Sequence, residues 1–161
     1  MKGFIPGLLD RLMDERREAG GDGGVARLNI EQLKDSVARE LEALLNTRVA
    51  LDPAIFNEFP QARASILNYG LIDFAGFCLS SAEDRAALCA SLKDAIETHE
   101  PRLKDVNAAL ELEAGSVNRL NFVITARLQV STAAEPVNFN AVLQPSSLHY
   151  SIGKVARPNR Q

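Results

Sequence analysis

The sequence predicts an α+β fold, with N-terminal helices packed on one face of a C-terminal antiparallel β-meander of three to four strands. The first observation is that apolar residues recur at helical spacing in two long stretches before Glu100. The second is that their period changes from about 3.6 to about 2 from Lys104 onward. The third is size, because 161 residues, 46% of them hydrophobic, are enough for one domain with its own core.

Residues 1–17 are expected to form an amphipathic docking helix, followed by a flexible Gly-rich linker over residues 18–27. A helix this short is marginal alone in water, so it must pack on its own domain or on another protein. The glycine tether leaves both options open. Docking to a membrane is disfavoured because the polar face carries as many acids as bases. The apolar residues at helical spacing are Phe4, Ile5, Leu8, Leu9, Leu12 and Met13, and those expected to dock are Phe4, Leu8, Leu9 and Leu12.

The main domain is expected over residues 28–155, with residues 156–161 as a C-terminal tail. Its first helix is predicted to be capped by Asn29, with Gln32 completing a variant of the capping box, and to end near Asn46. An apolar stripe makes it a core helix: Ile30, Leu33, Val37, Leu41, Leu44 and Leu45.

A second core helix is predicted from a cap at Ser81, with Asp84, to the turn at Pro101. Between the two helices, prolines and a glycine predict short helical turns and an ordered loop packed on the core. In the first helix, Asp35 and Arg39 lie four residues apart and are expected to pair.

The C-terminal part is predicted to be a meander because apolar and polar residues alternate and turn residues separate the alternating stretches. One-sided alternation with short links indicates an antiparallel sheet with one wet face. The last strand is the candidate edge, where another chain could add a strand. The four stretches are residues 106–112, 120–130, 137–143 and 148–152, with turns at 115–118 and 132–136.

Charge and cysteine content exclude several classes of protein. The net charge of −3 is uneven, with −5 over residues 51–100 and +3 over 101–161, but the dense basic face that nucleic acid requires is lacking. No run approaches the roughly 18 apolar residues of a membrane span, and the N-terminus lacks a secretory layout, so a cytoplasmic location is expected. Cys78 and Cys89 both lie beside apolar residues, which favours two buried free thiols over a disulfide.

No cofactor, metal ligand or catalytic residue is predicted. The two histidines and two cysteines lack ligand spacing, and the glycines at 20–24 are not followed by the Lys-Ser/Thr pair of a phosphate-binding loop. Paired carboxylates such as Glu111 and Glu113 keep a glycosidase as an alternative function. The absence of Trp and the presence of only two Tyr, which could stack on sugar rings, weaken that reading.

The short stretch Glu100-Pro101-Arg102 stands out at the end of the second predicted helix. A negative charge at a helix C-terminus is mildly unfavourable, so helix stability does not explain Glu100. Pro101 fixes the turn, which could present Glu100 and Arg102 as a rigid acid–base pair. The alternative is a solvated turn in which Arg102 merely offsets Glu100, and by itself the charge pattern favours this alternative.

Three stretches, in this order and spacing, resemble the TssE family, a relative of the lysozyme-like wedge proteins of contractile phage tails. They are residues 36–48, 65–71 and 100–103, and the segment 4–12 is also similar to the family's start, so the resemblance covers roughly residues 4–155. The second stretch contains Asn68-Tyr69-Gly70-Leu71, followed by Ile72 where many relatives have Pro. This departure affects only the local loop shape.

The resemblance implies a non-enzymatic structural subunit of the type VI secretion baseplate. It implies docking to TssF, TssG and TssK, and a sheet edge that helps start polymerisation of the TssB/TssC sheath at the inner face of the inner membrane. It also implies that Glu100, Pro101 and Arg102 make baseplate contacts, with neither nucleic acid nor direct membrane insertion involved. Two alternatives stay open, a cell-wall glycosidase (muramidase) and a small adaptor domain of the same fold. The Leu-rich N-terminal helix favours docking over catalysis.

Overall fold

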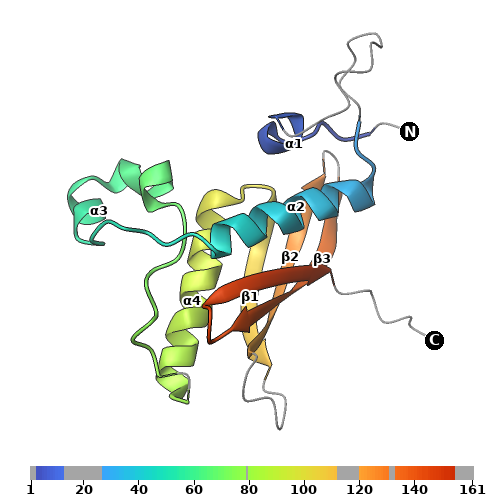
Figure 1. The fold of residues 1–161 in the computed structure, drawn as a ribbon. Coiled ribbons are helices and arrows are strands. Elements are labelled where there is room, and N and C mark those ends of the chain that lie inside the picture. Colours follow the sequence, from blue (N-terminus) through green and yellow to red (C-terminus); the bar gives the residue numbers. More distant parts are fainter. Residues whose placement is uncertain (1–2, 13–26, 79, 112–119, 131–132, 155–161) are drawn as a thin grey trace.

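The computed structural model describes residues 3–12, 27–78, 80–111, 120–130 and 133–154, and it has helices packed against a four-stranded antiparallel sheet (Figure 1). The strand order is β1-β2-β3-β4, so the predicted α+β class and the meander are confirmed. The elements are α1 (Leu8–Leu12), α2 (Ile30–Leu45), α3 (Ile55–Glu58), η2 (Pro60–Ala64), η3 (Ile66–Asn68), α4 (Ala82–His99), β1 (Leu103–Glu111), β2 (Leu120–Val130), β3 (Ala133–Gln144) and β4 (His149–Lys154).

One apolar core lies between the sheet and the helices α2 and α4. Alternate residues of β2 are buried, which is the period-2 pattern that predicted the strand. The stripe of α2 is buried as well, and burying one Leu-sized side chain contributes about 1.5–3 kcal/mol. The core therefore fixes α2 across the sheet. Its fully buried large side chains include Leu41, Leu45, Leu88, Leu92, Ile96, Phe122, Ile124, Leu128, Phe139 and Tyr150.

Both long helices begin where their caps predict. The Asn29 side chain accepts a hydrogen bond from the Gln32 N–H at 2.8 Å, and the Gln32 side chain accepts from the Asn29 N–H at 2.9 Å, which completes the capping box. Ser81 Oγ accepts from the Asp84 N–H at 3.3 Å at the start of α4. That helix ends at His99 because Pro101 cannot continue it.

The expectation that Asp35 and Arg39 pair with each other on α2 is wrong. Arg39 donates to Asp10 of α1 at 3.1 Å, whereas Asp35 lies 2.5 Å from the Lys154 ammonium at the end of β4. Neighbours brought close by tertiary folding thus take the place of the weak local pair.

The expectation of two buried thiols is wrong for Cys78. Both cysteines are free, but Cys78 is exposed in the turn before α4 and Cys89 is half-buried. The Sγ of Cys78 lies 3.0 Å from Ser80 Oγ, and hydrogen bonding to Ser80 lowers the pKa of the Cys78 thiol. Its apolar sequence neighbours therefore do not bury it.

The turn expected at 132–136 is wrong, because β3 already begins at Ala133 and residues 133–136 pair with β2. Several expectations fall outside the described residues: most of the linker over 18–27, Met13, the Leu9 side chain, the turn at 115–118 and the tail over 156–161. The division into a docking helix, linker, domain and tail stays a prediction. Residues 47–80 do contain short helices and an ordered loop, as predicted.

Candidate functional site

The Glu-Pro-Arg turn is locked by its own side chains. Glu100 caps α4 and is 4% exposed. Arg102 donates two hydrogen bonds to the Glu100 carboxylate, from Nε to Oε1 at 2.7 Å and from Nη2 to Oε2 at 2.5 Å. A forked pair of this kind has a defined geometry as well as a strong interaction. Glu100 and Arg102 therefore pair with each other, while Pro101 between them is exposed.

Arg102 also ties the turn to α2. Its Nη2 donates to Oε2 of Glu40 at 2.5 Å, across 62 residues of sequence. The side chains of Arg102 and Glu40 are 25% and 26% exposed. Burial raises the pKa of Glu40, the negative charges of Glu100 and Asp10 raise it further, and Arg102 opposes them. The Arg102 guanidinium thus forms hydrogen bonds with two carboxylates. The turn is therefore held by ion pairs and is not simply solvated.

Tyr69 belongs to the same environment. Burial raises the pKa of its phenol, and the charges of Glu40 and Glu100 add to that effect. Its ring meets the His99 ring edge-on, with the centroids 5.3 Å apart. His99 Nε2 lies 2.9 Å from the Asn68 carbonyl oxygen. The second family-like stretch, residues 65–71, therefore contacts His99, the residue that precedes Glu100.

Gly70 allows that stretch to approach α2. Its φ of +125° is a conformation that side chains other than glycine rarely adopt, and a Cβ there would lie 2.6 Å from the Thr47 oxygen. Main-chain bonds of 2.9 Å join Leu71 N to Thr47 O and Val49 N to Leu71 O. All three family-like stretches consequently converge on one region, which single-sequence spacing had not predicted.

The N-terminal segment lies against this cluster. Asp10 accepts from Ser36 Oγ at 2.5 Å and from Gly7 N at 3.2 Å, in addition to its bond from Arg39. A Cβ at Gly7 would be 3.0 Å from Glu40 Oε1 and 3.8 Å from Arg102 Nη1. The segment therefore passes directly over the Glu40–Arg102 pair.

Two apolar side chains of α1, those of Leu8 and Leu12, are directed outward instead. Leu8 is 64% exposed and Leu12 71% exposed, and Ile5 before the helix is 71% exposed. Phe4 differs, since it is half-buried, packs on the core, and forms a main-chain bridge to Leu28 with two bonds of 2.8 Å. Of the predicted docking residues, Leu8 and Leu12 are thus available to a partner. The side chain of Leu9 is outside the described residues.

Sequence reasoning missed Asp10, Ser36 and Glu40 as members of the cluster. Ser36 is 1% exposed, and it sits with Glu40 on one side of α2, four residues apart. The signal that the sequence offered for this cluster was a pair of polar residues, Ser36 and Glu40, at helical spacing beside the apolar stripe of α2. The identity of its partners came only from the tertiary structure.

The last strand is at the edge of the sheet, as predicted, but side chains of α2 and of the residues just after it occupy much of that edge. Asn46 bonds to both the N–H and the carbonyl of Tyr150 at 2.8 Å. Glu42 accepts from Ile152 N at 2.8 Å, and Arg48 donates to the Leu148 carbonyl at 2.9 Å. A further strand cannot pair along Leu148–Ile152 unless these side chains move.

The described residues contain no group of three or more His, Cys, Asp or Glu side chains arranged to hold a metal ion. Over the same residues, no helix is long and apolar enough to cross a membrane.

Comparison with known proteins supplies the identity of the family. Curated proteins give no match. A chain of one solved structure, "The baseplate complex from the type VI secretion system", is 18% identical and overlays with a TM-score of 0.48, covering 71% of this chain and 96% of that one. The family profile of "Baseplate wedge protein gp25" matches residues 31–133, from α2 into β3. These residues are well over half of the chain and include Glu40, Glu100 and Arg102, and the chain therefore belongs to the baseplate wedge protein gp25 family.

Proposed function

We propose that this chain is a structural subunit of a type VI secretion baseplate, which docks to the wedge complex and helps initiate polymerisation of the contractile sheath. Family membership supports a baseplate role, and the resemblance to TssE in three stretches supports this kind of machine. The partners would be TssF, TssG and TssK, with TssB/TssC as the sheath. The protein would act in the cytoplasm, in a baseplate docked at the inner face of the inner membrane.

The observation that carries the proposal is the outward apolar face of α1. Leu8 and Leu12 are largely exposed, while Asp10 on the same short helix is bonded to Ser36 and Arg39. Polar contacts with its own domain therefore hold the helix and leave Leu8 and Leu12 exposed to solvent. A helix that is already held in place loses little backbone freedom when a partner covers its exposed apolar side chains.

The Glu-Pro-Arg turn is the second part of the proposed docking surface. Pro101 is exposed and a quarter of the Arg102 side chain is exposed, so these two residues would touch the partner. Glu100 is buried and would act through Arg102, by holding the guanidinium in a single orientation.

Sheath initiation by strand addition would use β4 in a restricted way. The end of the strand beyond Ile152, or release of the α2 side chains, would have to supply the main-chain groups. This makes the contact between α2 and β4 part of the proposal.

The test is co-purification with TssF and TssG from the same host. The intact chain is expected to bind, and a Glu100→Ala/Arg102→Ala double variant with an unchanged circular dichroism spectrum is expected to bind at least about tenfold more weakly. A Leu8→Asp/Leu12→Asp variant tests α1 separately, and Glu97→Gln on the exposed side of α4 is the matched control. Failure of the intact chain to bind would remove the proposal. Binding by an unrelated regulator instead would favour the adaptor alternative.

We also propose that the chain is not a muramidase. Glu40 and Glu100 are both hydrogen-bonded to the single guanidinium of Arg102, and Glu100 is 4% exposed, whereas the two carboxyls of a glycosidase flank the sugar bond and must be open to it. Purified protein is expected to leave peptidoglycan intact. Turnover that Glu40→Gln or Glu100→Gln abolishes would reverse this assignment.

A further inference from the structure

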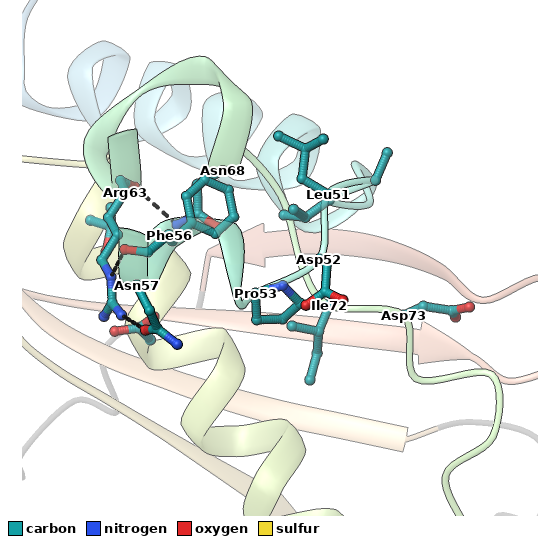
Figure 2. Close-up of a pocket in the computed structure, with 13 residues that line it drawn as sticks. Leu51, Asp52, Pro53, Phe56, Asn57, Arg63, Asn68, Ile72 and Asp73 are labelled. Carbon is teal, nitrogen blue, oxygen red and sulfur yellow. Dashed lines mark hydrogen bonds between the residues drawn. The ribbon is translucent and has the colours of Figure 1, made fainter. Parts of the chain in front are cut away.

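We propose that a groove beside the Glu-Pro-Arg turn binds a segment of a partner protein in which an arginine or lysine is flanked by apolar residues. The groove has a volume of about 740 Å³ and is lined by residues 49–53, 56–57, 63, 68, 72–73 and two positions on α4, Asp94 and Thr98 (Figure 2). Asn68 belongs to its wall, and the Asn68 carbonyl contacts His99. The groove is therefore next to the cluster described above but does not include it.

The lining of the groove combines apolar and polar side chains and is partly open to solvent. Leu51, Pro53, Phe56 and Ile72 contribute to it, and Ile72 is 40% exposed. The chain from α3 to η3 exposes further large apolar side chains, with Phe59 61% and Ile66 85% exposed. Large exposed apolar side chains within one short stretch of chain are typical of a protein-binding surface.

The charge of the lining selects the occupant. Three carboxylates line the groove, those of Asp52, Asp73 and Asp94, and none of them forms an ion pair within the described part of the chain. The only cation in the lining is Arg63, and its guanidinium is already engaged. Its Nη2 donates to Asn57 Oδ1 at 2.7 Å and its Nε to the Phe56 carbonyl at 3.3 Å, and Figure 2 shows these contacts at one end of the groove.

The carboxylates do not gather into a metal site. Asp52 and Asp73 each use one oxygen to accept a main-chain N–H, from Ala54 at 2.8 Å and from Ala75 at 3.0 Å. No three acidic side chains of the described residues are arranged around a common point for a metal ion. Dispersed negative charge over an apolar lining instead matches a long cationic side chain. Its methylene stem covers the apolar residues while its charged head reaches a carboxylate.

The segment is expected to carry apolar residues beside its cation because the lining contains Leu51, Pro53 and the exposed Ile72 besides its carboxylates. The proposed baseplate role supplies neighbouring proteins that would carry the segment, so identifying them rests on the proposed function. The preference of the groove for a cationic side chain does not rest on that function. The proposed function and the proposed groove can therefore be disproved separately.

The test compares two peptides that differ only in charge. The isotope-labelled full chain is titrated with acetyl-Leu-Arg-Leu-amide and with the same peptide carrying citrulline, the neutral counterpart of arginine. The arginine peptide is expected to shift the amide signals of Asn57 and Ile72 and to bind about three- to tenfold more tightly than the citrulline peptide. Equal binding of the two, or no binding by either, would overturn the proposal.

Variants then locate the site. Asp52→Asn/Asp94→Asn keeps the shape of both side chains and the acceptor at Asp52, and it is expected to abolish the preference for arginine. Asp94 makes no hydrogen bond to another described residue, so Asp94→Asn alone controls for a folding defect in the double variant. Glu97→Gln on the same helix is the control that should bind as the wild type. An arginine preference retained in both Asn variants would refute the groove as the site.

The same variants can be tested with TssF–TssG. If the wild type binds and Asp52→Asn/Asp94→Asn binds more weakly, the groove serves that complex. If the wild type does not bind TssF–TssG, the proposed function falls while the peptide titration still decides the groove.

Discussion

Asn46 at the end of α2 bonds to the main chain of Tyr150 in both directions, although 104 residues separate them. Its Nδ2 donates to the Tyr150 carbonyl and its Oδ1 accepts from the Tyr150 N–H, both at 2.8 Å. The side-chain amide thus occupies the positions that a neighbouring strand would use. Covering an edge in this way protects a sheet against unwanted pairing. The edge that could extend the sheet is therefore closed at its centre in the isolated chain.

Replacing Asn46 by Ala is expected to lower the free energy of unfolding by about 1–3 kcal/mol, because two buried main-chain groups lose their partners. Amide exchange at Tyr150 should become faster. Urea denaturation and hydrogen exchange measure the two effects. Asn138→Ala, at an exposed position on β3, is the control and should change little. Unchanged exchange at Tyr150 would show that the bonds do not protect the edge.

Tyr150 is fully buried, and its hydroxyl has no hydrogen-bond partner among the described residues. Burial raises the pKa of its phenol. Tyr150→Phe is therefore expected to leave stability unchanged or to raise it by up to about 1–2 kcal/mol, since an unsatisfied polar group is removed. Tyr150→Ala should cost about 3–5 kcal/mol because it leaves a cavity. Thermal and urea unfolding check both, and a clear loss in the Phe variant would mean that the hydroxyl has a partner.

The raised pKa of Glu40 predicts that the free energy of unfolding depends on pH. Burial raises its folded-state pKa above 4.5, so the folded state holds the proton more tightly than the unfolded state. This contribution is present below the unfolded pKa and is lost as pH rises through the folded pKa. The stability of the wild type relative to Glu40→Gln is therefore expected to fall as pH rises from about 4 to about 7.

Urea denaturation across that range measures the difference, with Glu97→Gln as a matched exposed control. A difference that grows with pH would mean that the bond to Arg102 outweighs the burial of Glu40.

Gly7→Ala tests the passage of the N-terminal segment over the cluster. The new Cβ would lie 3.0 Å from Glu40 Oε1, which is tighter than ordinary contact, and Arg102 holds that carboxylate in place. We expect a loss of about 0.5–1.5 kcal/mol and faster proteolysis of the N-terminal segment, because α1 must shift. Gly76→Ala is the control, since a Cβ there meets nothing within 4 Å. Equal behaviour of the two variants would mean that the segment is not packed on Glu40.

The Glu40–Arg102 and Asn46–Tyr150 contacts differ from the caps in how far apart their partners lie in sequence. The cap at Asn29 and the cap at Ser81 each use residues within one turn, so their spacing alone predicts where a helix begins. The alternation that predicted the strands is equally local. The fold class, the starts of α2 and α4, and the strand order could be predicted for this reason.

By itself, the sequence determined the α+β class, the two core helices, the order of the meander and the presence of an unusual Glu-Pro-Arg turn. Only the tertiary structure decided that Glu100 is buried, that Arg102 serves Glu40 as well, that α1 directs Leu8 outward, and that α2 closes the edge at β4. The physical reason is the range of the interactions. Caps and periodicity act within a few residues, whereas the Glu40–Arg102 ion pair and the Asn46–Tyr150 edge contact join groups 62 and 104 residues apart that meet only once the core has packed.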